Sequence, residues 1–279
     1  MIVEKKLKSG VIGWPVMHSL SPRLHQYWLK EDNINGSYEA LEINPNEIHA
    51  FIKNLSSNGF IGANVTVPYK ETAANIVDVL DENSNRLGAI NTIVVGKDGL
   101  IYGSNTDGFG FMENLKSNFP QWEPKNGPVV LLGAGGAARA ITASLLDAKV
   151  PEIRLTNRTY KKTQNLVNKI GGSVKIYDWK NRSKILQDAS LLINTTTLGM
   201  IGNPGLEINL DLLPLNAVVM DIVYSPLKTR LLEQAENRLN PFINGLGMLL
   251  HQARPGFHQW FGKNPEVTCK LQKHVLLGV

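Results

Sequence analysis

The stretch Val129-Val130-Leu131-Leu132-Gly133-Ala134-Gly135-Gly136-Ala137-Ala138 passes from an apolar run into a glycine-rich turn and then into a helix-forming segment. An uninterrupted Val/Leu run is typical of a buried parallel strand. Gly133, Gly135 and Ala138 have the G-x-G-x-x-G/A spacing, in which small residues let backbone N–H groups approach a pyrophosphate at the start of the following helix. A turn of this kind can also serve only to pack a helix on a strand. We predict a dinucleotide-binding turn because a helical segment, 139–148, and a second short strand, 153–155, follow it.

Short apolar strands alternate with helical segments along the rest of the chain, which predicts an α/β fold with parallel sheets and right-handed crossovers. We expect strands near 9–13, 38–43, 60–68, 87–95, 100–103, 153–157, 174–177, 191–196, 218–224 and 241–245. We expect helices near 22–33, 45–55, 109–118, 139–148, 161–170 and 246–262, with a last one from about 266. A chain of 279 residues is long enough for two domains of ordinary size.

The composition is that of a globular protein, with 43% hydrophobic and 19% charged residues. The net charge of +5 is spread along the chain, which favours an anionic small ligand over nucleic acid. Cys269 is the only cysteine, which excludes an internal disulfide. No apolar run approaches the ~20 residues that cross a bilayer, and the segment 1–10 is charged where a signal peptide needs an apolar core. We therefore expect a cytoplasmic protein without membrane partners.

The end of the second strand of the dinucleotide unit reads Asn157-Arg158-Thr159. An acid at this position would hold the adenosine ribose hydroxyls, whereas a basic residue accommodates a 2′-phosphate. Arg158 can give a phosphate planar, charge-assisted hydrogen bonds. This predicts NADP rather than NAD, although a solvated basic helix start would look the same.

Several polar residues in the first 107 positions lie where strands give way to helices. Ser21 precedes a helix and could be its N-cap, while Ser19 has no capping role to explain it. Lys70 is expected in the first turn of a helix, where its charge opposes the helix dipole; a solvated surface lysine is the alternative. Asn91 interrupts an apolar strand, and Asp107 could be a helix N-cap.

Eight motifs in this order resemble the shikimate dehydrogenase family across nearly the whole chain. They are Ser19-Leu20-Ser21-Pro22, residues 62–70, Ala89-Ile90-Asn91-Thr92, Asn105-Thr106-Asp107-Gly108, residues 133–137, Asn157-Arg158-Thr159, residues 221–226 and residues 245–253. The resemblance implies reversible reduction of the C3 carbonyl of 3-dehydroshikimate to shikimate by NADPH, in chorismate and aromatic amino acid biosynthesis. The chain departs slightly from the family pattern at Thr195, where a smaller side chain is usual.

The resemblance also assigns roles to residues. Lys70 and Asp107 would be the catalytic pair, and either of them could transfer the proton. The substrate carboxylate would be bound by Ser19 and Ser21 with Tyr224 nearby, and the ring hydroxyls by Thr66, Asn91 and Gln252. The cofactor would be held by Gly133, Ala134, Gly135, Gly136, Ala137, Asn157, Arg158, Thr159, Lys162, Ile222 and Gly245, and also by Glu82. No metal is implied.

Because residues 19–107 and Gln252 would act on one substrate, we predict a discontinuous substrate domain, 1–105 with 246–279. Residues 106–245 would form a Rossmann-type NADP domain, with an interdomain cleft. One alternative is a quinate/shikimate dehydrogenase with relaxed use of NAD and NADP; another is a non-catalytic NADP-binding sensor on the same fold. The expected partner is a small molecule, and the protein would be a monomer or homodimer.

Overall fold

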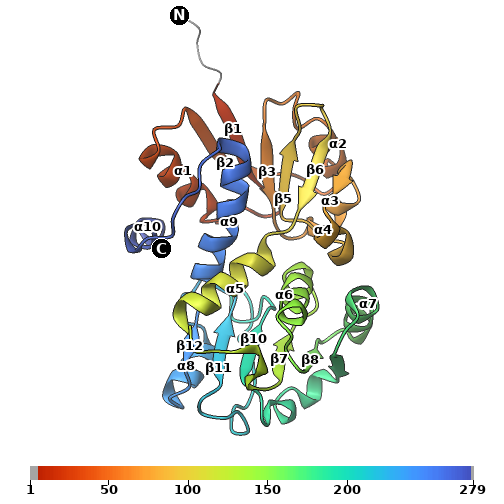
Figure 1. Ribbon diagram of the computed structural model, residues 1–279, viewed down its shortest axis with the longest axis vertical. Coiled ribbons are helices and arrows are strands. Elements are labelled where there is room, and N and C mark those ends of the chain that lie inside the picture. The colour runs from red at the N-terminus through yellow and green to blue at the C-terminus, as the bar shows by residue number, and fades with distance from the viewer. Residues whose placement is uncertain (1–5, 278–279) are drawn as a thin grey trace, which may run out of the picture. The chain divides into compact units, whose positions relative to one another are not determined.

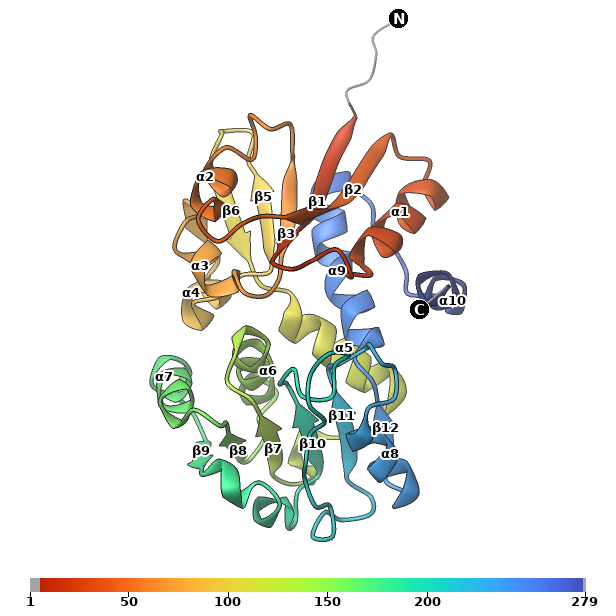
Figure 2. The same cartoon turned by 180° about the vertical axis from the view of Figure 1, so that it is seen from behind.

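The computed structural model describes residues 6–277, and its elements are labelled in Figure 1 and seen from behind in Figure 2. The chain forms two compact units. Unit 1 combines the residues up to Thr106 with those from Leu250 onward, and unit 2 is Asp107–Leu249. The boundary on the C-terminal side falls within one helix, α9 (Leu246–Phe261).

Unit 1 is built around a mixed sheet, whose strand order within the described residues is β2-β1-β3-β5-β6-β4. Its strands are β1 (Leu7–Gly13), β2 (Gly36–Glu42), β3 (Gly62–Val65), β4 (Val79–Leu80), β5 (Thr92–Val95) and β6 (Ile101–Ser104). Its helices are α1 (Ser21–Glu31), α2 (Ile48–Lys53), α3 (Lys70–Ala74), α4 (Glu82–Leu87) and α10 (Cys269–Leu276), together with most of α9.

The sheet of unit 1 is parallel at β2-β1-β3 and antiparallel at β3-β5-β6. A turn around Gly99, which has φ +83°, joins the antiparallel pair β5-β6. The predicted strand 87–95 was wrong in its first part. Leu87 instead ends helix α4, and Gly88 closes that helix in the left-handed region at φ +62°.

The two sides of this sheet bury different kinds of residue. Aliphatic side chains of β1, β3, β5 and β6 pack with those of α2 and α3 in one core cluster. An aromatic group joins α1 and α9 instead: His25, Trp28, Phe257 and Trp260 lie in ring contact with one another or with Tyr38 of β2. The Tyr38 hydroxyl connects this aromatic group to Asn64, a polar residue of the network described below, by a hydrogen bond of 2.6 Å.

Unit 2 contains an all-parallel sheet of order β12-β11-β10-β7-β8-β9 among the described residues. Its strands are β7 (Val129–Leu132), β8 (Ile153–Thr156), β9 (Val174–Tyr177), β10 (Leu191–Asn194), β11 (Val218–Asp221) and β12 (Phe242–Ile243). Its helices are α5 (Asp107–Asn118), α6 (Gly136–Asp147), α7 (Tyr160–Ile170) and α8 (Arg230–Asn237), and short 3₁₀ helices lie at Pro124–Asn126, Trp179–Asn181 and Lys184–Leu186.

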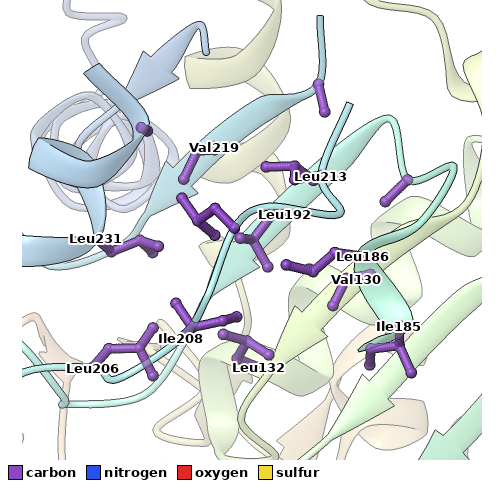
Figure 3. Packing of buried hydrophobic residues seen from close by; sticks show 14 of the residues in the cluster. Val130, Leu132, Ile185, Leu186, Leu192, Leu206, Ile208, Leu213, Val219 and Leu231 are labelled. Atoms are coloured by element: carbon purple, nitrogen blue, oxygen red, sulfur yellow. The ribbon is translucent and has the colours of Figure 1, made fainter. Parts of the chain in front are cut away.

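The strand order reverses between β7 and β10, the point at which doubly wound sheets bind nucleotides. Helix α6 contacts both α5 and α7. Leucine and valine side chains from alternate strand positions, including Val130, Leu192 and Val219, pack with Leu231 of α8 (Figure 3). The predicted α/β fold class with a doubly wound dinucleotide unit is confirmed.

Candidate active site

The glycine turn follows β7, whose residues are all fully buried. Gly133 has φ +114°, and a Cβ there would collide with the hydroxyl of Thr195, which follows β10. Glycine is therefore required at this position by both backbone conformation and space. Gly135 is exposed, and a Cβ there would meet no atom within 4 Å. The space beside Gly135 is open to a ligand that needs close approach to the backbone.

Helix α6 begins at Gly136 with Gly135 in the N-cap position and no side-chain hydrogen bond to its first turn. Ala134 is buried, whereas Gly136 and Ala137 are half-buried. The first N–H groups of a helix have no intrahelical acceptor, and the helix dipole is positive at this end. Since no acidic side chain lies in this first turn, the donors suit a phosphate group.

The end of β8 presents the basic segment. Leu132 and Thr156 are register partners, so the segment 157–159 starts beside the glycine turn. The Asn157 side-chain amide donates to the Thr159 carbonyl at 3.0 Å, which shapes the turn into α7. Arg158, Thr159 and Lys162 are exposed, and the first turn of α7 contains no acidic residue. These residues fit a phosphate of the adenosine moiety, as predicted for NADP.

The carboxyl ends of β10 and β11 are tied by a buried acid. Asp221 is fully buried and accepts hydrogen bonds from the Thr229 hydroxyl at 2.7 Å and from the Asn194 amide and Val223 N–H at 3.0 Å. Burial raises the pKa of Asp221 to about 6, although these donors act in the opposite direction. Asp221 therefore holds the loop that carries Ile222.

Two predicted cofactor contacts are close neighbours in unit 2. Gly245 donates its N–H to the Val223 carbonyl at 3.0 Å, and a Cβ at Gly245 would collide with the Ile222 backbone. Tyr224 is half-buried, and burial raises the pKa of its phenol. Asp107 is buried and is the first residue of α5.

In unit 1 the two predicted carboxylate-binding serines lie between β1 and α1. The Ser19 hydroxyl accepts the N–H of Ser21 at 3.2 Å, at the start of α1, so the expectation that Ser19 has no capping role was wrong. Ser21 is the first residue of α1 and Leu20 occupies the N-cap position without a side-chain bond, so Ser21 is not the N-cap. Ser21 is buried and Ser19 half-buried.

The segment after β3 carries the next two candidates. Thr66 is half-buried just beyond the strand, and its N–H donates to the Ile12 carbonyl at 2.9 Å. Lys70 is half-buried and begins α3, as predicted, while its carbonyl accepts the Ile90 N–H at 2.9 Å. Glu82 lies in the first turn of α4 and is exposed.

Asn91 and Gln252 are brought together although 161 positions separate them. The Asn91 side-chain nitrogen donates to Gln252 Oε1 and to the Thr106 hydroxyl, each at 2.9 Å. Both residues are buried: 2% of the surface of Asn91 and 9% of that of Gln252 is exposed. Two residues predicted from separate motifs therefore form one hydrogen-bonded pair in unit 1.

Several residues behind this pair were not singled out as site candidates from the sequence. The Tyr38 hydroxyl donates to Asn64 Oδ1 at 2.6 Å, and the Asn64 nitrogen donates to the Asn91 carbonyl at 2.9 Å. His25 stacks on Tyr38 at 3.9 Å between ring centroids and is fully buried, which lowers its pKa to about 3. The polar Asn64 inside an otherwise apolar strand was the available signal for this network.

Among residues 6–277, no group of three or more histidine, cysteine, aspartate or glutamate side chains is arranged to hold a metal ion. No helix in that range is long and apolar enough to span a bilayer.

Two family models match the chain. Residues 11–93 match the shikimate dehydrogenase substrate binding domain, and residues 113–201 match shikimate/quinate 5-dehydrogenase. A relative from Paramagnetospirillum magneticum, named shikimate dehydrogenase (NADP(+)), is 52% identical over 96% of this chain and 97% of its own. The chain belongs to the shikimate dehydrogenase family. The family predicted from the eight motifs is thus confirmed.

Two solved structures align with this chain along nearly its whole length. The enzyme from Thermus thermophilus, in complex with NADP(H) and shikimate, has a TM-score of 0.86 and 32% identity, covering 98% of this chain and 100% of that one. The quinate dehydrogenase from Corynebacterium glutamicum, in complex with NAD, has a TM-score of 0.89 and 26% identity, with coverage of 98% and 100%. The fold alone therefore does not separate the two substrates or the two cofactors.

Proposed function

We propose that the protein is an NADP-dependent shikimate dehydrogenase. It would reversibly reduce the C3 carbonyl of 3-dehydroshikimate to shikimate in chorismate and aromatic amino acid biosynthesis. The observation that carries this proposal is the 52% identity, along 96% of the chain, to a relative named shikimate dehydrogenase (NADP(+)). The uncapped start of α6 and the basic segment 157–159 support the choice of cofactor.

The substrate is a small polyhydroxylated acid, which needs many short polar partners. We propose that Ser19, Ser21 and Tyr224 bind its carboxylate, and that Thr66, Asn91 and Gln252 bind its ring hydroxyls. The direct bond between Asn91 and Gln252 supports a shared role for these two amides. A site with buried polar groups rejects analogues that leave those groups unpaired.

The reaction needs a hydride for the carbonyl carbon and a proton for the carbonyl oxygen, and the nicotinamide supplies only the hydride. We propose that Lys70 and Asp107 handle the proton and stabilise the charge that develops on the oxygen. The half-buried position of Lys70 at the start of α3 and the burial of Asp107 support this assignment. Either group can formally deliver the proton.

The cofactor is placed by the residues of unit 2. In this proposal residues 133–137 hold the pyrophosphate, and Asn157, Arg158, Thr159 and Lys162 surround the 2′-phosphate. Ile222 and Gly245 offer backbone contacts near the nicotinamide. Glu82, which is exposed on α4, would add a contact.

We further propose that the protein acts in the cytoplasm as a monomer or homodimer, without nucleic-acid or membrane partners.

The test is a spectrophotometric assay of NAD(P)H formation in which shikimate and quinate are each combined with NADP⁺ and with NAD⁺. We expect the highest kcat/KM with shikimate and NADP⁺. A flat trace with that pair from folded protein would refute the proposal. Equal turnover of quinate with NAD⁺ would instead support the broader quinate/shikimate activity.

A matched pair of variants tests the catalytic residue. Lys70→Ala should reduce kcat by about 10²-fold or more, the usual contribution of a positioned acid or base, with NADP binding nearly unchanged. Lys53, on α2 in the same unit, is a surface residue paired with Asp78, so Lys53→Ala is the control for loss of one lysine. Retained turnover in Lys70→Ala would exclude the proposed role for Lys70, and turnover lost equally in both would exclude a specific effect.

A further inference from the structure

The direction of the Asn91 amide is determined by a backbone donor. The Thr106 N–H lies 2.9 Å from Asn91 Oδ1, and a backbone N–H can only donate. Oxygen and nitrogen of an amide are assigned from their partners, so this contact identifies which side of Asn91 is oxygen. The amide nitrogen of Asn91 must then face the opposite way, toward Gln252.

The Thr106 hydroxyl agrees with this assignment. It has a single hydrogen, and the Gln252 backbone carbonyl, which can only accept, lies 2.7 Å away. The hydroxyl therefore accepts from the Asn91 nitrogen at 2.9 Å. The same nitrogen also donates to Gln252 Oε1 at 2.9 Å.

A chain of buried residues fixes the same amide from the other side. The Asn64 nitrogen donates to the Asn91 backbone carbonyl at 2.9 Å, which leaves Asn64 Oδ1 to accept from the Tyr38 hydroxyl at 2.6 Å. The Thr92 hydroxyl lies 3.3 Å from the Asn64 nitrogen, a donor, and 2.9 Å from Asn91 Oδ1. Thr92 consequently accepts from Asn64 and donates to Asn91.

We infer that Tyr38, Asn64 and Thr92 are positioning residues that lock the Asn91 amide in one direction and thereby make Gln252 a donor toward the substrate. Because Gln252 Oε1 is taken by Asn91, the Nε2 group lies on the other side of the amide, where it can donate to a substrate oxygen. This inference rests on the proposed function, since it concerns how the ring hydroxyls of shikimate are recognised. Tyr38 and Thr92 are fully buried, so they act only through the residues they touch.

Thr92→Val removes the hydroxyl at nearly constant volume, and Thr92→Ser keeps it. We expect Thr92→Val to raise KM for shikimate about tenfold, the value of one hydrogen bond, with KM for NADP⁺ unchanged. Thr92→Ser should restore a KM close to that of the wild type. Tyr38→Phe keeps the ring on His25 but removes the donor to Asn64, and should raise the same KM by about twofold to fivefold.

The control is Thr142→Val in α6. Thr142 is also fully buried, but its hydroxyl has no hydrogen-bond partner among the described residues. This variant should leave KM for shikimate unchanged.

A double-mutant cycle separates positioning from packing. If Thr92 acts through Gln252, Thr92→Val should have almost no further effect on KM in a Gln252→Ala background. Additive effects would overturn the inference, and so would a Thr92→Ser variant as impaired as Thr92→Val.

Hydrogen exchange of the side-chain amides provides a readout that needs no turnover. By NMR, the Asn91 NH₂ group should be protected in the wild type and in Thr92→Ser, and less protected in Thr92→Val and Tyr38→Phe. An unprotected Asn91 amide in the wild type would overturn the inference whatever the activity. Protection of the Asn91 amide without any shikimate turnover would refute the proposed function but not the amide geometry. If Thr92→Val does not fold, Tyr38→Phe takes its place in this comparison.

Discussion

Replacing His25 by phenylalanine should make the protein less sensitive to acid. His25 is fully buried, stacked on Tyr38, and its other ring neighbours are Trp28, Phe257 and Trp260. These neighbours carry no charge to compensate an imidazolium. Burial accordingly lowers the pKa of His25 from its usual 6.5 to about 3.

The direction in which pH changes the stability follows from which state, folded or unfolded, binds the proton first as the pH falls. Below pH 6.5 the unfolded chain protonates at His25 while the folded chain does not, so acid favours unfolding until the pH reaches about 3. The stability present above pH 6.5 is lost over this window. A shift of roughly 3.5 pH units, at about 1.4 kcal/mol per unit, corresponds to about 5 kcal/mol.

Urea unfolding between pH 8 and pH 3, followed by tryptophan fluorescence, measures this effect, because Trp28 and Trp260 lie against His25. At pH 8 the larger ring of His25→Phe should cost about 1–3 kcal/mol from overpacking. As the pH falls, the free energy of unfolding of the wild type should approach and then fall below that of the variant. Two curves that stay parallel from pH 7 to pH 3 would refute the reasoning.

Three further predictions concern unit 2. Burial raises the pKa of Asp221 to about 6, so its effect on stability runs in the opposite direction to that of His25. The contribution of Asp221 to the free energy of unfolding is greatest below pH 3.8, and about 3 kcal/mol of it is lost as the pH rises through 6. In urea unfolding, Asp221→Asn should no longer show this pH-dependent loss. Gly135→Ala should leave the melting temperature nearly unchanged but weaken NADP binding measured by calorimetry. Gly133→Ala, at φ +114°, should instead lower the melting temperature. Unaltered NADP binding by folded Gly135→Ala would argue against the pyrophosphate site. Arg158→Ala should raise KM for NADP⁺ by about 10–100-fold and leave KM for NAD⁺ little changed, since the substitution removes a charge-assisted hydrogen bond to the 2′-phosphate. Lys169→Ala, at the far end of α7, removes the same charge and is the control; it should change neither KM.

Much of the fold was predictable because it depends on local patterns. The buried run of β7, the glycine turn and the basic end of β8 are each contained in a few consecutive residues, and the structure has them as predicted. The errors lie at element ends. Leu87 ends a helix where a strand was expected, because the five polar residues of α4 and the capping Asp81 outweigh the apolar pattern that begins there.

The site residues named from the sequence stay predictions, and the sequence did not reveal the hydrogen-bonded network around them. Ser19 shows the difference: its hydroxyl caps a backbone N–H at the start of α1, a role that spacing did not reveal. Tyr38 and Thr92 have no unusual sequence context, since each sits in a strand where its residue type is common. Only their partners distinguish them.

The sequence by itself determined the family, the dinucleotide turn and the identity of the polar residues, because periodicity, turn chemistry and motif order are properties of neighbouring residues. The tertiary structure alone decided that Asn91 meets Gln252 across 161 positions, that Tyr38 reaches Asn64, and that His25 is sealed among aromatic rings. These pairings depend on strand order, on register and on how α1 and α9 pack, and none of those is encoded in a short stretch of chain.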